Sequence, residues 1–114
     1  MNLKTVTKND VTILRLQDAR LDNVIAAELK AHLLVMIEEQ RIKNILIDLA
    51  EVEYADSSGL GAILFGIRQA RPVNGHIKLV NPQSRVLGLI KIAKLENVIE
   101  AYDDESEALE SFQE

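Results

Sequence analysis

A short polar stretch, Asp56-Ser57-Ser58, stands where the chain changes from a strand-like to a helix-like pattern. Asp and Ser side-chain oxygens accept hydrogen bonds from the free N–H groups of a first helical turn, and the helix dipole favours negative charge there. A phosphate on one of these serines would gain from the same dipole, whereas Asp56 would repel it. The stretch therefore predicts a helix start at which a serine can exist in two states of charge.

Other chemistries of these hydroxyls are less well supported. A plain helix cap is the simplest alternative. Nucleophilic catalysis is disfavoured, because Gly-x-Ser-x-Gly is absent and the sequence places neither His32 nor His76 near Ser57. No metal site is expected, since the chain has no cysteine and its two histidines are far apart. Gly59-Leu60-Gly61 lacks the lysine of a P-loop, so nucleotide binding is only weakly indicated. No catalytic residue, metal ligand or cofactor is assigned.

Small residues follow the serines at Gly59, Gly61 and Ala62. Such residues allow the first turns of a helix to approach a sheet closely. Gly61 is expected to lie at that contact, so Gly61→Val is predicted to lower stability by overpacking.

The rest of the chain must position this stretch. Two runs rich in β-branched residues, 3–8 and 11–16, are separated by Asn9-Asp10, which predicts a hairpin. Asp22 or Asn23 is expected to cap a helix that ends near Gln40. The remaining expected elements are a strand over 44–49, a loop through 51–54, a helix from residue 56 that ends before Pro72, a strand over 76–80, a helix over 85–92, a short strand over 98–101, and a final helix over 105–112 capped by Asp103 or Asp104.

These elements predict the α/β class: one domain in which an N-terminal β-hairpin leads into a mostly parallel mixed sheet covered by about four helices. After the hairpin, strands alternate with helices three times, which is typical of right-handed βαβ crossovers. In such sheets functional side chains lie beyond the carboxyl ends of the strands, where Asp56 and Ser57 fall. Asp22 follows the second strand and is expected at the same edge.

Length and composition narrow the class of protein. The chain has 114 residues, of which 47% are hydrophobic, so a single domain over residues 1–114 is expected. It lacks a signal-peptide core and any apolar run near the ~20 residues of a membrane helix, which with the absence of cysteine favours a cytoplasmic location and no membrane span. The net charge is −5, and the basic residues form no cluster. Direct nucleic-acid binding is therefore disfavoured.

The chain resembles bacterial STAS domains, and specifically the anti-sigma factor antagonists, in the stretch Tyr54-Ala55-Asp56-Ser57-Ser58-Gly59-Leu60-Gly61 and in the run Ile45-Leu46-Ile47-Asp48-Leu49 before it. The resemblance extends to Arg20-Leu21-Asp22, to the Asn74-Gly75 turn and to the acidic final helix. In that family the first hydroxyl residue after the aspartate accepts the phosphate, which corresponds to Ser57 here. With the helix-start argument, this implies a partner-binding surface of Asp22, Asp56, Ser57, Ser58 and Gly59.

Ser57 is preferred to Ser58 for a second reason as well. Ser58 is expected to lie within the first helical turn, whereas Ser57 is expected at the exposed boundary, where a kinase can reach its hydroxyl.

The resemblance implies a regulatory switch and no enzyme activity. The unphosphorylated domain would bind an anti-sigma factor that is also a serine kinase, so that a sigma factor is released and transcription changes. Phosphorylation of Ser57 would end the interaction, and a PP2C-type phosphatase would reset it. The alternative is a non-phosphorylated STAS scaffold, or a nucleotide-sensing module, in a stress-signalling or transport complex, because a fold does not by itself define a function.

Overall fold

The N-terminal hairpin forms as predicted in the computed structural model, which describes residues 1–113. β1 (Leu3–Lys8) and β2 (Val11–Leu16) pair antiparallel. Asn9 and Asp10 connect them with left-handed backbone angles, φ 52° and 65°. A two-residue hairpin turn requires this conformation, and Asn and Asp tolerate it better than most side chains.

The hairpin is part of a five-stranded sheet of order β1-β2-β4-β6-β7. β4 (Asn44–Asp48) lies between β2 and β6 (His76–Val80) and runs parallel to both, and β7 (Ala101–Tyr102) runs parallel to β6 at the edge. The predicted mostly parallel mixed sheet is therefore confirmed. The side chains of Ile45, Leu46 and Ile47 are fully buried, as expected for a strand that is covered on both faces.

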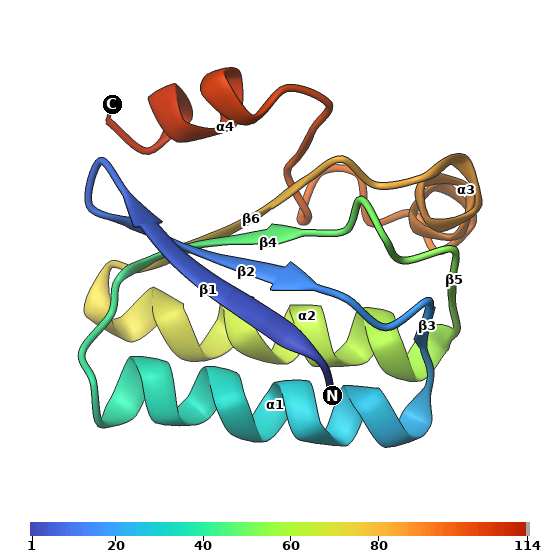
Figure 1. Ribbon diagram of the computed structural model, residues 1–114, viewed down its shortest axis with the longest axis horizontal. Coiled ribbons are helices and arrows are strands. Elements are labelled where there is room, and N and C mark those ends of the chain that lie inside the picture. The colour runs from blue at the N-terminus through green and yellow to red at the C-terminus, as the bar shows by residue number, and fades with distance from the viewer. Residues whose placement is uncertain (114) are drawn as a thin grey trace.

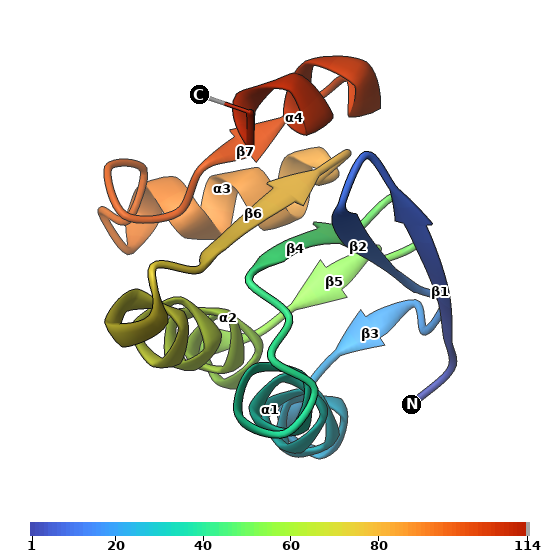
Figure 2. The ribbon, with the colours of Figure 1, turned by 90° about the vertical axis from the view of Figure 1, so that its left-hand side faces the viewer.

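In the described part of the chain, four α-helices cover the sheet: α1 (Asn23–Glu38), α2 (Ser57–Ala70), α3 (Ser84–Ile92) and α4 (Glu105–Ser111). Figure 1 shows α1 and α2 on one face and α4 on the other, and Figure 2 shows the same layers from the side. The larger core cluster joins α1, α2 and α3 to one face of the sheet, and a smaller one lies beneath α4. Within residues 1–113, no helix has both the length and the apolar character needed to cross a membrane.

The boundaries of two predicted elements need comment. α2 ends at Ala70, and Pro72 lies in the short 3₁₀ helix η1 (Arg71–Val73), so the predicted end of this helix is confirmed. The strand predicted over 98–101 is wrong in position, because β7 begins only at Ala101. The N–H of Ile99 donates instead to the carbonyl of Leu95 at 2.8 Å, and this turn buries the Ile99 side chain in the core.

A second sheet consists of two short strands, β3 (Arg20–Leu21) and β5 (Tyr54–Ala55), which pair in parallel. The loop predicted through residues 51–54 is therefore wrong at Tyr54. The pairing is reinforced by the carbonyl of Ala19, which accepts hydrogen bonds from the N–H groups of Glu53 and Tyr54 at 2.8 and 3.1 Å. This small sheet connects the main sheet to the starts of α1 and α2.

An ion-pair network anchors α4 to the main sheet. Arg15 Nη1 lies 2.8 Å from Asp48 Oδ2 and 2.7 Å from Glu105 Oε1, and Lys8 Nζ lies 2.9 Å from Glu105 Oε2. The hydrogen bonds to Glu105 and then to Asp48 raise the pKa of Arg15 further above its ordinary value. The hydrogen bonds from Arg15 and then Lys8 lower the pKa of Glu105 to about 2. Both groups therefore stay charged at neutral pH.

Candidate functional site

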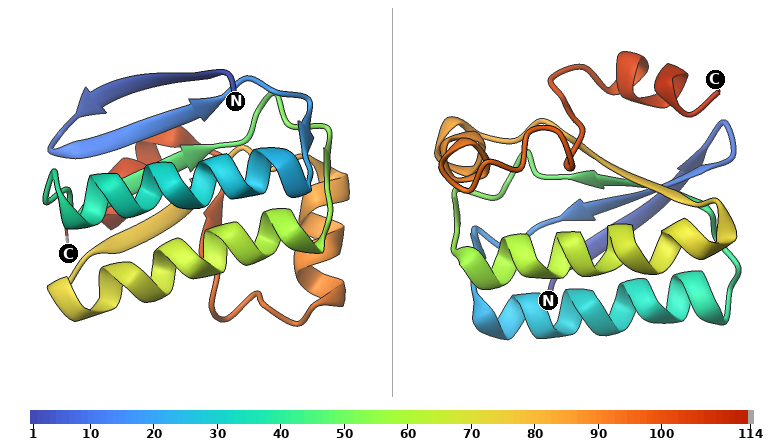
Figure 3. Two further views of the ribbon diagram at one scale, coloured as in Figure 1. Left: turned by 90° about the horizontal axis from the view of Figure 1, so that it is seen from below. Right: turned by 180° about the vertical axis from the view of Figure 1, so that it is seen from behind.

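Two acidic residues, Asp22 and Asp56, lie at one edge of the molecule because the strands before them are paired. β3 and β5 end at Leu21 and Ala55, which are opposite each other in the parallel ladder. The N–H of Asp56 donates to the carbonyl of Leu21 at 3.3 Å, so the pairing extends as far as the aspartate. The first turns of α1 and α2 consequently lie at the same end of the molecule (Figure 3).

Each of these aspartates caps a helix. The N–H groups of Val24 and Ile25 each donate to Asp22 Oδ1 at 3.2 Å. The N–H of Gly59 donates to Asp56 Oδ1 at 3.1 Å. Both side chains are half-buried, and neither forms an ion pair with any residue in 1–113. Their negative charge is therefore balanced only by backbone N–H groups and by the helix dipoles.

Ser57 and Ser58 are the first two residues of α2, and both are exposed. The expected difference in exposure between them is therefore wrong, because Asp56 is the N-cap and both serines lie in the first turn. In the described part of the chain, neither hydroxyl forms a hydrogen bond, and the N–H groups of both serines have no acceptor. Free N–H groups in a first turn are suited to an oxyanion.

Gly59 allows α2 to begin against β3. A Cβ atom at this position would lie 2.6 Å from the carbonyl oxygen of Leu21 and 2.8 Å from Leu21 Cγ, so a side chain requires the backbone to move. Gly61, by contrast, is exposed, and within residues 1–113 no atom outside the neighbouring helix backbone lies within 4 Å of its Cβ position. The expected close contact at Gly61, and with it the predicted overpacking by Gly61→Val, is therefore wrong.

Neither His32 nor His76 lies at the start of α2 with the serines. His32 lies in the middle of α1. His76 is the first residue of β6, at the amino-terminal ends of the parallel strands, whereas α2 begins beyond their carboxyl ends. No group of three His, Asp or Glu side chains in residues 1–113 is arranged to hold a metal ion. The site offers carboxylates and free hydroxyls on an exposed surface, which can bind a partner or accept a phosphate.

Three residues beside this site were not predicted from the sequence. Arg20 on β3 and Arg85 on α3 both lie against the ring of Tyr54 on β5, with guanidinium carbons 5.3 and 5.9 Å from the ring centroid. Together with Ala19 and Glu53 they line a cavity of about 480 Å³. The one sequence signal is the alternation in Arg20-Leu21-Asp22 and Tyr54-Ala55-Asp56, which is typical of a strand with one buried face.

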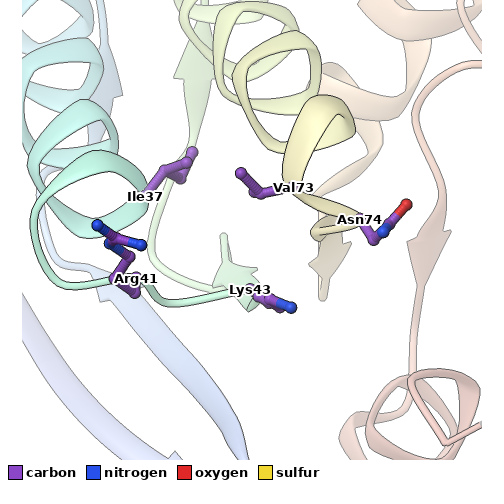
Figure 4. A pocket seen from close by; sticks show the side chains of 5 residues that line it. All are labelled: Ile37, Arg41, Lys43, Val73 and Asn74. Carbon is purple, nitrogen blue, oxygen red and sulfur yellow. The ribbon is translucent and has the colours of Figure 1, made fainter.

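A second cavity, of about 320 Å³, lies at the other end of the helices. It is lined by Ile37 of α1, by Arg41 and Lys43 of the loop that follows α1, and by Val73 and Asn74 at the end of η1, and Figure 4 shows Ile37 and Val73 pointing toward each other. The cavity lies where α1 and α2 end, at Glu38 and Ala70. It is also remote from Ser57, at the opposite end of α2.

The chain is similar to known proteins over most of its length. A family model described as STAS domain matches residues 2–108. A protein of Thermotoga neapolitana is 39% identical to this chain over 70 residues, which cover 61% of this chain and 62% of that protein. Its name describes it as a homolog of TM1081 and a proposed anti-sigma factor antagonist. The match thus spans about six tenths of the length of the curated relatives.

Solved structures agree with this match. The crystal structure of TM1081 from Thermotoga maritima matches this chain with a TM-score of 0.88 at 25% identity, and the match covers 98% of this chain and 95% of that one. TM1081 is also described as a proposed anti-sigma factor antagonist. The anti-sigma factor antagonist SpoIIAA in its unphosphorylated form has a TM-score of 0.82 at 21% identity, covering 98% and 96%. At that identity SpoIIAA supports the fold alone.

Proposed function

The chain belongs to the STAS domain family, and from this premise we propose that it is an anti-sigma factor antagonist whose partner binding is controlled by a phosphate on Ser57. In its unphosphorylated form it binds an anti-sigma factor that is also a serine kinase, and a sigma factor is thereby released. The kinase then phosphorylates Ser57, and the complex dissociates. A PP2C-type phosphatase restores the binding form. The protein itself performs no catalysis.

The observation that supports this function best is the pairing of β3 with β5. It brings the half-buried caps Asp22 and Asp56 to one surface, beside the exposed hydroxyl of Ser57. We assign the partner contact to these three residues together with Ser58 and Gly59. Because Ser57 and Ser58 are both exposed, the choice of Ser57 rests on the family resemblance, in which the first hydroxyl after the aspartate is modified.

A phosphate on Ser57 has opposite effects on the fold and on the complex. It adds about −1.5 to −2 charges, but free N–H groups and the dipole of α2 offset repulsion from Asp56. The protein therefore stays folded. In the complex the same charge would be buried beside two carboxylates, and uncompensated buried charge commonly costs several kcal/mol. Partner affinity therefore falls by orders of magnitude.

The test is incubation of the purified protein with ATP and each serine-kinase anti-sigma factor encoded in the same genome. Mass spectrometry should locate one phosphate on Ser57, and Ser57→Ala should abolish it. Ser84→Ala is the matched control, because Ser84 is also an exposed first residue of a helix but its N-cap, Gln83, forms no side-chain cap hydrogen bond. A PP2C-type phosphatase should remove the phosphate.

Three outcomes would contradict the proposal. Phosphate on Ser58 would reassign the acceptor. Unchanged kinase affinity after phosphorylation would show that the modification is not a switch. Tight binding of a kinase that never transfers phosphate would favour the non-phosphorylated scaffold.

A further inference from the structure

Arg20, Tyr54 and Arg85, here called the cationic cluster, come from three different elements, β3, β5 and α3. Both guanidinium groups lie within 6 Å of the centre of one aromatic ring. The ring attracts the cations through its negative face and limits the rotamers that the long arginine side chains adopt. The cluster is therefore partly ordered before anything binds, although its members are exposed to solvent.

The positive charge of this cluster has no fixed counter-charge. Among residues 1–113, neither Arg20 nor Arg85 forms an ion pair, whereas Arg15 in the main sheet is paired with two carboxylates. Glu53 also lines the cavity but is exposed and lies beyond ion-pair distance of both arginines. Two guanidinium groups on one ring repel each other, so an anion that enters the cavity is favoured.

The cluster and the two aspartate caps lie on the same side of the β3–β5 ladder. Side chains two residues apart on a strand point the same way, about 7 Å apart. Arg20 therefore shares a side with Asp22, and Tyr54 shares a side with Asp56, whereas Leu21 between them is 1% exposed and points inward. The positively charged cationic cluster and the two negatively charged aspartates are therefore on the same surface of the protein.

We infer that the cationic cluster is a receptor for one acidic side chain of the protein that binds at Asp22, Asp56 and Ser57. This inference rests on the proposed function, because it takes its ligand from the same partner. A guanidinium fork matches the two oxygens of a carboxylate, and arginine and tyrosine are enriched among residues that dominate binding energy.

The receptor fixes the orientation of the partner. A partner with only basic groups would pair with the aspartates and leave both arginines unpaired. A partner bound in the reversed orientation would place its acidic groups against the aspartates and its basic groups against the arginines. Such juxtaposition suppresses incorrect partners. Glu53 lines the same cavity without pairing with either arginine, so its negative charge repels an incoming anion and limits occupation of the receptor by small anions.

The first test needs no partner. N-acetylglutamate amide, which has a single side-chain carboxylate, is titrated at low salt against ¹⁵N-labelled protein, with N-acetylglutamine amide as the neutral control. The Nε–H signals of Arg20 and Arg85 should shift with millimolar affinity, and those of Arg41 should not. Since the chain has no tryptophan, Tyr54 fluorescence in a Tyr102→Phe background should change in parallel. Glu53→Gln should strengthen the binding.

The second test uses a serine-kinase anti-sigma factor that binds the wild-type protein. Arg20→Gln and Arg85→Gln should each weaken the complex about tenfold or more, Glu53→Gln should strengthen it, and Arg41→Gln should leave it unchanged. If the arginine variants bind as wild type while Asp22→Asn does not, the receptor is refuted and the proposed function stands.

The remaining outcomes are also decisive. If no kinase binds the wild-type protein, the proposed function fails, and the probe titration still decides the receptor. The receptor is refuted if the Arg20 and Arg85 signals do not shift, or if the neutral control or the Arg41 signal shifts equally. Shifts of Arg20 and Arg85 caused by phosphorylation of Ser57 alone would identify the protein's own phosphate as the occupant, and the inference would be wrong.

Discussion

Carboxylates have different roles in two regions of this molecule. Asp48 and Glu105 share Arg15 and join the main sheet to α4. Asp22 and Asp56 are half-buried, and among residues 1–113 they accept hydrogen bonds only from backbone N–H groups. A carboxylate paired with a cation is neutralised within the fold, whereas a carboxylate that only caps a helix remains a charge that a partner can detect. Under the proposed function, the first pair of carboxylates serves stability and the second serves recognition.

Arg15→Met tests the carboxylates that are paired within the fold. Asp48, which is 7% exposed, loses its cation, and Glu105 retains only Lys8. We expect the free energy of unfolding to fall by about 3 kcal/mol, with partner affinity unchanged because Arg15 bonds to α4, which covers the opposite face of the sheet from α1 and α2. Urea denaturation measures the first effect and partner titration the second. Arg68→Met is the control, because Arg68 is exposed and forms no ion pair among residues 1–113. Equal midpoints for the two variants would contradict the assignment.

Gly59→Ala tests the contact between α2 and β3. The new Cβ displaces the Leu21 carbonyl, which also accepts the N–H of Asp56. We expect a loss of about 2 kcal/mol and weaker partner binding. Gly61→Ala should instead gain about 0.5 kcal/mol, because the site is open and alanine favours helix. Similar urea midpoints for the two variants would show that the start of α2 is not tightly packed.

The stability of the protein should depend on pH through Glu105, the carboxylate that is paired with Arg15 and Lys8. The pKa of Glu105 is lowered from 4.5 to about 2 in the folded protein, so between these values the unfolded chain binds more protons. Stability from this group is therefore complete above pH 4.5 and is lost as the pH falls towards 2. Because Glu105 is a quarter exposed, solvent screening limits the loss to about 1–2 kcal/mol. Denaturation curves between pH 2.5 and 7 should show a smaller acid loss in Glu105→Gln than in wild type.

The smallest effect on stability is expected at Asp22. Asparagine keeps the cap oxygen and removes the charge, so Asp22→Asn should change the free energy of unfolding by less than about 0.5 kcal/mol. It should nevertheless weaken partner binding. Asp48→Asn removes an ion pair instead and should cost more stability without affecting the partner. The comparison fails if Asp22→Asn destabilises the protein as much as Asp48→Asn does.

The sequence predicts the larger elements well because their patterns are local. The hairpin bounds, the caps of α1 and α2 and the parallel sheet all follow from periodicity and turn residues. The β3–β5 ladder does not, because two residues per strand are too few to establish a period. The choice of Gly61 over Gly59 fails for a geometric reason: positions two apart on a helix differ by about 200°, so they lie on opposite faces.

Contacts between distant segments are the other part that the sequence does not reveal. Arg15 and Glu105 are separated by 90 positions, and nothing near either residue specifies the partner. Arg85 reaches Tyr54 only because α3 packs beside β5. The placement of Asp22, Asp56 and Ser57 at helix starts could be read locally and is confirmed, whereas the cationic cluster depends on tertiary packing.

The separation of β3 and β5 from the five-stranded sheet has a consequence for motion. Short ladders open without global unfolding, so their amides exchange with solvent deuterium faster than those of a central strand. The N–H groups of Glu53, Tyr54 and Asp56, which bond to Ala19 and Leu21, should exchange sooner than those of β4. A bound partner would slow their exchange, and part of its binding energy would then be used to order this ladder.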